Sequence, residues 1–161
     1  MAEIINSLWV GKSLSLMEQL SITSFLRNGH EYDLYCYNEI ADVPAGATLR
    51  DAAEILPSSE IFYYRHGAGK GSVAGFSNLF RFKLLFEKRG WWVDTDVVCL
   101  RPFDFDEPIV LASERTGDRV ASRNGGAQVS ARARGRRSVL RGGPPREPGA
   151  RDVGKNRPAI A

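Results

Sequence analysis

The chain has 161 residues, which is enough for one domain, and a formal net charge of +3. It contains no apolar run near the ~20 residues that cross a bilayer and no basic leader followed by an apolar stretch, so we expect no transmembrane segment and a cytoplasmic protein. Cys36 and Cys99 both lie in apolar runs, where buried, reduced thiols are expected.

Charge is distributed unevenly along the chain. Residues 1–115 contain 11 Lys and Arg against 16 Asp and Glu, whereas residues 116–161 contain 11 Lys and Arg against 3 Asp and Glu. The overall positive charge is therefore not the property of one folded surface. We expect an acidic domain over residues 1–115, followed by a basic tail.

The N-terminal part of the chain predicts a strand, a helix and a second strand. Residues 4–10 are apolar and end at a glycine, residues 15–28 suit a helix that ends at Gly29, and residues 32–37 alternate and are rich in aromatic side chains. A strand, helix and strand in succession normally place both strands parallel in one sheet. This order predicts an α/β fold.

Residues 49–56 are next predicted to form a short helix, which Pro57 stops. Residues 66–71 are rich in glycine, but Gly71 follows Lys70 where a Walker A loop has Ser or Thr, and the dinucleotide fingerprint does not fit either. We therefore expect a mobile loop beside a ligand site.

A second long helix is predicted after this loop, with Ser77 as its N-cap and Gly90 closing it. Its apolar residues recur at helical spacing: Leu79, Phe82, Leu85 and Phe86. Residues 91–100 follow as an apolar strand ended by Pro102, and residues 109–112 predict another short strand.

Two carboxylates interrupt the predicted strand over residues 91–100. Asp94 and Asp96 are two residues apart, so on a strand they share a face and converge on one site. Like charges this close need a cation, and hard oxygen ligands suit Mg²⁺ or Mn²⁺, which would hold a nucleotide diphosphate. The alternative is a solvated strand end with two surface aspartates, but the flanking tryptophans and valines leave little surface for charge.

The segment around this pair resembles a known family. Residues 76–98 read FSNLFRFKLLFEKRGWWVDTDVV. They are similar to the DXD sugar-binding glycosyltransferases, in which a Ser-Asp-x-x-Arg helix, a Gly-Gly turn, an aromatic residue and Asp-x-Asp follow in order. The resemblance covers about residues 4–115 and extends to the α-glycosyltransferases of family 32 and, more distantly, to the clostridial glucosylating toxins.

The resemblance implies a GT-A-like, nucleotide-sugar-binding fold over residues 1–115. Ser77, Asn78 and Arg81 would face a UDP- or GDP-sugar donor, Asp94 would lie near its ribose or sugar hydroxyls, and Asp94 and Asp96 would serve the Mn²⁺ or Mg²⁺ site. The implied reaction transfers the sugar, with retention of configuration, to a saccharide or other hydroxyl acceptor. It assigns no catalytic residue, and no nucleic-acid partner is expected.

The chain departs from the family pattern at two positions. Asn78 stands where the family has Asp, and Arg89 stands where it has the first Gly of the turn. An amide carries no charge, so donor affinity or sugar choice is expected to differ. Without the resemblance, Arg81 would be interpreted as an ordinary solvated helix residue. The three tryptophans are expected in the core, with one aromatic ring available to stack on the nucleotide base.

Residues 116–161 contain no Phe, Trp or Tyr but 10 Arg, 8 Gly and 4 Pro. Such a segment cannot bury enough apolar surface to order itself, so we expect disorder. One interpretation is a basic arm for nucleic acid or anionic membrane. We favour translation of a GC-rich gene out of frame, in which case the family's C-terminal half, with a further metal ligand and most of the acceptor site, would be missing.

Two alternatives to a metal-dependent glycosyltransferase remain open. Residues 94–98 also fit the Asp-x-Asp-x-Val nucleophile strand of haloacid-dehalogenase-like phosphatases, which would use Asp94 and Asp96, although that motif normally opens its domain. The other alternative is a truncated, non-catalytic product that binds donor weakly or not at all.

Overall fold

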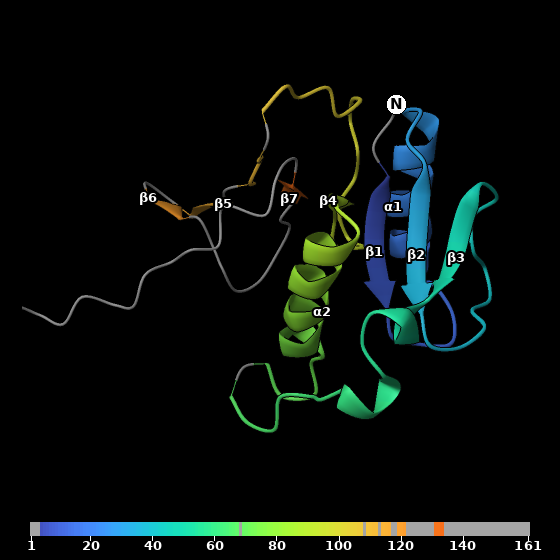
Figure 1. Ribbon diagram of the computed structural model, residues 1–161, viewed down its shortest axis with the longest axis vertical. Helices are drawn as coiled ribbons and strands as arrows, with labels where there is room; N and C mark the ends of the chain where they lie inside the picture. The colour runs from blue at the N-terminus through green and yellow to red at the C-terminus, as the bar shows by residue number, and fades with distance from the viewer. Residues whose placement is uncertain are drawn as a thin grey trace, which may run out of the picture.

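The computed structural model describes residues 4–67, 69–107 and 109–112, together with the backbone of three short strands, β5 (Glu114–Thr116), β6 (Arg119–Ala121) and β7 (Ala131–Ala133). The predicted disorder of residues 116–161 otherwise concerns positions outside these ranges. Strands and helices follow one another along the chain (Figure 1), which confirms the predicted α/β class. No helix in the described part is both long and apolar enough to traverse a bilayer.

The core of the fold is a parallel sheet in the order β3-β2-β1-β4. Its strands are β1 (Ile5–Trp9), β2 (Tyr32–Cys36), β3 (Ala47–Asp51) and β4 (Gly90–Trp92), and β7 pairs antiparallel with the outer edge of β4. The chain builds β2 and β3 on one side of β1 and then crosses to its other side to form β4. The strand order thus reverses between β1 and β4, and in open parallel sheets ligands bind outside the carboxyl ends of the strands at such a reversal.

The two helices cover opposite faces of the sheet (Figure 1). Successive strand residues point to opposite faces, so the buried side chains form two separate clusters, one beneath each helix. Helix α1 (Leu16–Arg27) packs with one set of buried side chains that includes Ile5, Phe25, Tyr32, Trp91 and Val93. Helix α2 (Ala74–Glu87) packs with the other set, which includes Leu8, Tyr35, Phe76, Phe80 and Trp92.

Helix α1 confirms its predicted bounds and shows why the sequence marked them. Ser15 is the N-cap of a capping box, in which its backbone N–H donates to a carboxylate oxygen of Glu18 at 2.7 Å. Gly29 follows the helix with a φ of 81°, a conformation in which glycine has no Cβ to clash.

The helix predicted over residues 49–56 is wrong. The chain instead continues β3 to Asp51 and then makes one 3₁₀ turn, Ala52–Glu54. All five residues of β3 pair in register with β2. The hydrogen bonds that this edge of β2 offers outweigh the weak helical preference of the segment. Short apolar runs do not distinguish the two structures by themselves.

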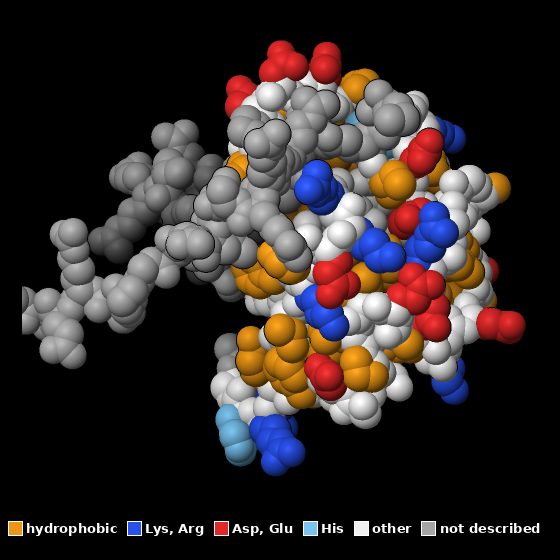
Figure 2. Space-filling view, viewed as in Figure 1, with side chains coloured by type: hydrophobic (Ala, Val, Ile, Leu, Met, Phe, Trp, Pro, Cys, Tyr) orange, Lys and Arg blue, Asp and Glu red, His pale blue; other side chains and the backbone are white. Residues whose placement is uncertain are grey.

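Helix α2 exists as predicted, but it begins earlier and faces differently. It starts at Ala74, whose N–H donates to the Ser72 hydroxyl at 3.1 Å, so Ser77 lies in the first turn and is not the N-cap. Of the apolar residues that predicted the helix, Leu79, Phe82 and Phe86 are exposed. Figure 2 shows hydrophobic side chains gathered over this helix and the loop before it.

The strand predicted over residues 91–100 is also wrong in length. It ends at Trp92, and the chain then turns back along α1. Side chains of α1 bind the backbone of this returning segment: Ser24 Oγ accepts from the N–H of Cys99 at 2.8 Å, and the Asn28 amide donates to its carbonyl oxygen at 3.0 Å. Residues 109–112 contain no strand. Both cysteines are buried free thiols, as expected.

Candidate functional site

Asp94 and Asp96 lie in a tight turn and not on a strand. The N–H of Val97 donates to the carbonyl oxygen of Asp94 at 3.2 Å, which closes a four-residue turn that Val93 separates from the end of β4. The shared face predicted from strand alternation is therefore wrong. The Asp94 side chain is half-buried, whereas Asp96 is exposed. We call residues 94–97 the carboxylate turn.

The carboxylate turn lies where the strand order reverses. β4 runs parallel to β1, with Ile5 opposite Trp91 and Asn6 opposite Trp92, so both carboxyl ends point the same way. The turn leaves β4 at this end, and the chain leaves β1 there through Val10 and Gly11. This is the position at which an open parallel sheet accommodates a ligand.

Arg81 lies on α2 and is almost completely buried, with 5% of its surface exposed. The alternative interpretation of Arg81 as an ordinary solvated helix residue is therefore wrong. Its Nη2 donates to Oδ1 of Asn78 at 2.7 Å, one helical turn earlier. Burial lowers the pKa of Arg81, while the negative charge of Asp94 acts in the opposite direction. The negative charge of Asp94 thus acts on a buried cation of α2.

The Asp94 carboxylate also has a partner on β4. Trp92 is buried, and its Nε1–H donates to Oδ1 of Asp94 at 3.0 Å. Trp92 packs near Phe80, the residue before Arg81 on α2. The orientation of the carboxylate is therefore set by the core.

The remaining predicted site residues lie close by in the chain. Ser77 is half-buried in the first turn of α2, next to Asn78. The loop over residues 66–71, apart from residue 68, leads into that turn and is closed by a hydrogen bond from the N–H of Gly71 to the carbonyl oxygen of Tyr64 at 2.8 Å. Of the three tryptophans, Trp91 and Trp92 are core residues, whereas Trp9 is partly exposed at the carboxyl end of β1.

A resident metal would find few protein ligands near this turn. Within the described ranges, no three His, Cys, Asp or Glu side chains form a group that could hold an ion. Mg²⁺, however, is commonly bound by one or two carboxylates together with substrate phosphates and water. The two aspartates of the carboxylate turn fit that kind of incomplete site, in which the diphosphate itself completes the coordination.

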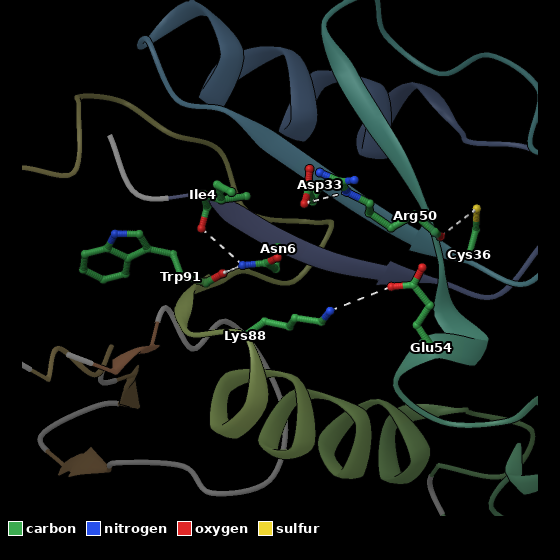
Figure 3. A network of polar contacts seen from close by, with 8 residues as sticks. All are labelled: Ile4, Asn6, Asp33, Cys36, Arg50, Glu54, Lys88 and Trp91. Atoms are coloured by element: carbon green, nitrogen blue, oxygen red, sulfur yellow. Dashed lines mark hydrogen bonds and ion pairs between the residues drawn. The ribbon is translucent and has the colours of Figure 1, made fainter. Parts of the chain in front are cut away.

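A second polar region lies along β1, β2 and β3 near the C-terminal end of α2 and was not predicted (Figure 3). A cavity of about 280 Å³ opens there between β1, β2 and the end of α2, with Asn6, Asp33, Arg50, Glu54 and Lys88 in its lining. Figure 2 shows acidic and basic side chains mixed on this face. The only sequence signal was Asp33, a charged residue within an otherwise apolar strand.

Four charged side chains around this cavity are paired with one another. Arg50 Nε donates to Oδ2 of Asp33 at 2.9 Å, and Lys88 lies 3.9 Å from Glu54. Asn6 donates its amide protons to the backbone carbonyl oxygens of Ile4 and Trp91, at 3.2 and 2.9 Å. These contacts join β2 to β3, β1 to β4, and the 3₁₀ turn after β3 to the end of α2. The cavity therefore has a structural explanation, and the carboxylate turn remains the candidate site.

The fold and the turn define the chain as an α/β protein with a parallel sheet and paired aspartates at its reversal point. No protein-family model, curated protein or solved structure matches it. The resemblance to the DXD glycosyltransferases thus remains a prediction from the sequence.

Proposed function

We propose that residues 4–112 form the donor-binding part of a metal-dependent glycosyltransferase that takes a nucleotide diphosphate sugar. The observation that carries this proposal is the link between Asp94, in the turn after β4, and the part of α2 that contains the buried Arg81: Trp92 donates to Asp94 and packs near Phe80, and the charge of Asp94 acts on Arg81. Hydroxyl-rich, doubly charged ligands require an acceptor group and a cation side by side, and this arrangement supplies both. Both α2 and the carboxylate turn would contact the donor.

Each residue has a distinct role in this proposal. Asp94, oriented by Trp92, accepts hydrogen bonds from ribose or sugar hydroxyls, while Arg81 faces the donor from α2. Asn78 keeps Arg81 in place through its amide oxygen, so the side-chain carbonyl performs the contact for which a carboxylate would also serve. Asp96, at the exposed tip of the turn, is a ligand for Mn²⁺ or Mg²⁺, which would neutralise charge on the diphosphate leaving group.

Trp9 extends the proposal to the nucleotide base. It is the partly exposed tryptophan at the carboxyl end of β1, and its Nε1–H donates to the carbonyl oxygen of Ser13 at 3.1 Å. A ring fixed in this way offers one face for stacking without losing much conformational freedom on binding. The acceptor would be a saccharide or another hydroxyl compound.

The test is calorimetric titration of the full chain with UDP and GDP, with and without Mn²⁺. We expect Mn²⁺ to strengthen binding, and we expect Asp96→Asn to remove that gain because a neutral amide does not balance the ion. Asp104→Asn, which neutralises an exposed carboxylate elsewhere, is the matched control and should retain the gain. Metal-independent binding by the folded parent would reject the proposal. Binding without sugar transfer would favour the non-catalytic alternative.

A further inference from the structure

Two backbone carbonyls flank the carboxylate turn, and both accept hydrogen bonds from buried hydroxyls. Ser7 on β1 donates to the carbonyl oxygen of Val93 at 2.6 Å, and Ser21 on α1 donates to the carbonyl oxygen of Val97, also at 2.6 Å. Both serines are completely buried. The turn is thus anchored at both ends: β1 holds Val93, the residue before the turn, and α1 holds Val97, its last residue.

Tyr32 on β2 lies beside both serines. Its hydroxyl oxygen is 2.6 Å from Ser7 Oγ, and the hydroxyl of Ser21 is near enough to act on the pKa of the phenol. Each hydroxyl has a single proton to donate. Because Ser7 donates its only proton to the carbonyl oxygen of Val93, Tyr32 must donate its own proton to Ser7 Oγ. Burial raises the pKa of Tyr32, so the phenol keeps this proton at neutral pH.

We propose that Ser7, Tyr32 and Ser21, the hydroxyl triad, are positioning residues that hold the carboxylate turn in its ligand-binding geometry. Three hydroxyls from three elements meet inside a core that otherwise contains Ile5, Ile22 and Phe25. Burying hydroxyls there is unfavourable unless each one makes a hydrogen bond, and the triad satisfies all three together with both flanking carbonyls.

The ligand-binding role rests on the proposed function, whereas the anchoring of the turn is a property of the fold. The two are separated by amide hydrogen exchange on the full chain without ligand. Tyr32→Phe removes the phenol hydroxyl, and we expect the amide of Val97, bonded to Asp94, to exchange about tenfold faster, as the loss of a buried hydrogen bond would give. Helix α2 amides should keep their protection.

Tyr37→Phe is the matched control. The Tyr37 hydroxyl donates to the carbonyl oxygen of Leu56 at 2.8 Å, away from the turn, so its removal should leave Val97 exchange unchanged. Ser21→Ala, which removes only the anchor at Val97, is the second variant and should reproduce the effect of Tyr32→Phe. Unchanged exchange at Val97 in both triad variants, or equal acceleration in the Tyr37 control, would overturn the anchoring.

Calorimetry then tests the ligand-binding role. We expect Tyr32→Phe to reduce the Mn²⁺-dependent gain in UDP affinity about five- to tenfold and to leave metal-free UDP binding within about twofold, because the triad acts through the turn. Faster Val97 exchange with an unchanged Mn²⁺ gain would overturn this role. If the parent shows no Mn²⁺ gain, the proposed function fails, and the exchange data still decide whether the triad anchors the turn.

Discussion

Phe103 donates its backbone N–H to Nε2 of His30, with 3.0 Å between the two nitrogen atoms. A ring nitrogen that accepts a hydrogen bond carries no proton, so the imidazole is neutral and its proton is on Nδ1. The ring packs against Phe25 and Phe103, at centroid distances of 6.0 and 5.5 Å. His30 therefore ties the segment that leaves the carboxylate turn to the end of α1.

This contact makes stability depend on pH. Burial lowers the pKa of His30 below its usual 6.5, so the unfolded chain takes up the proton first as the pH falls. We expect the free energy of unfolding to be steady above about pH 7, to fall as the pH drops through about 6.5, and to level off below the folded-state pKa. Urea unfolding at pH 7.5 and 5.5 measures this. His30→Leu should remove the difference, whereas His66→Gln, at an exposed position, should keep it. Greater stability at pH 5.5 would contradict the assignment.

Arg89 is strained, and glycine should relieve the strain. Its φ is 65°, a left-handed conformation that costs an ordinary residue about 1–2 kcal/mol. Glycine removes this cost, but its greater freedom in the unfolded chain offsets part of the stabilisation. We therefore expect Arg89→Gly to raise the free energy of unfolding by about 0.5–1 kcal/mol. Lys88→Gly, one residue earlier with a φ of −102°, should lower it instead. Denaturant titration of both variants gives the comparison, and equal effects would refute it.

Gly90 combines positive φ with a close backbone approach. Its φ is 94°, and a Cβ at this position would lie 2.8 Å from the carbonyl oxygen of Ile4. We expect Gly90→Ala to lower the free energy of unfolding by about 3 kcal/mol or more, because strain and a steric clash act together. Gly29 has a φ of 81° but no atom within 4 Å of the added Cβ, so Gly29→Ala should cost only about 1 kcal/mol. Similar losses in thermal or urea unfolding would argue against the clash.

The ion pair between Asp33 on β2 and Arg50 on β3 should stabilise the fold more than the neighbouring pair of Lys88 and Glu54. The Asp33 side chain is only 10% exposed, so Arg50→Ala leaves a largely buried carboxylate without this partner. Because Arg50 itself is 46% exposed and screened by solvent, we expect a loss of about 1–2 kcal/mol. Lys88 and Glu54 are both about half exposed, and Lys88→Ala should change stability by less than about 0.5 kcal/mol. Urea unfolding of the two variants distinguishes these values, and equal losses would contradict the difference in burial.

The sequence predicted the elements that its periodicity and caps define and missed those that neighbouring strands impose. The capping box at Ser15 marked α1 by local chemistry. The sequence did not predict β3, because most of its side chains are exposed and its pairing with β2 depends on the tertiary structure. The apolar spacing of α2 identified a helix but not its buried face, since Leu79 and Phe82 are exposed while Phe76 and Phe80 fill the core.

The sequence predicted which residues lie near one another at the candidate site better than it predicted how their side chains are arranged. Motif spacing grouped Asn78, Arg81 and Asp94, which the structure brings into one neighbourhood. The turn after β4 changed the relation between the two aspartates, because backbone conformation and not residue alternation decides where they point. Ser7 and Tyr32 were missed because a polar residue in a strand looks the same in sequence whether it faces water or a buried carbonyl.

The hydrogen bond between Trp92 and Asp94 also couples an ultraviolet chromophore to the candidate site. Indole fluorescence depends on the electric field at the ring and on the hydrogen bond at its nitrogen, so a cation or hydroxyl that approaches Asp94 should change the emission of Trp92 without any added label. Trp9→Phe and Trp91→Phe together would leave Trp92 as the only indole in the chain. The protein therefore contains its own optical reporter of occupancy at the carboxylate turn.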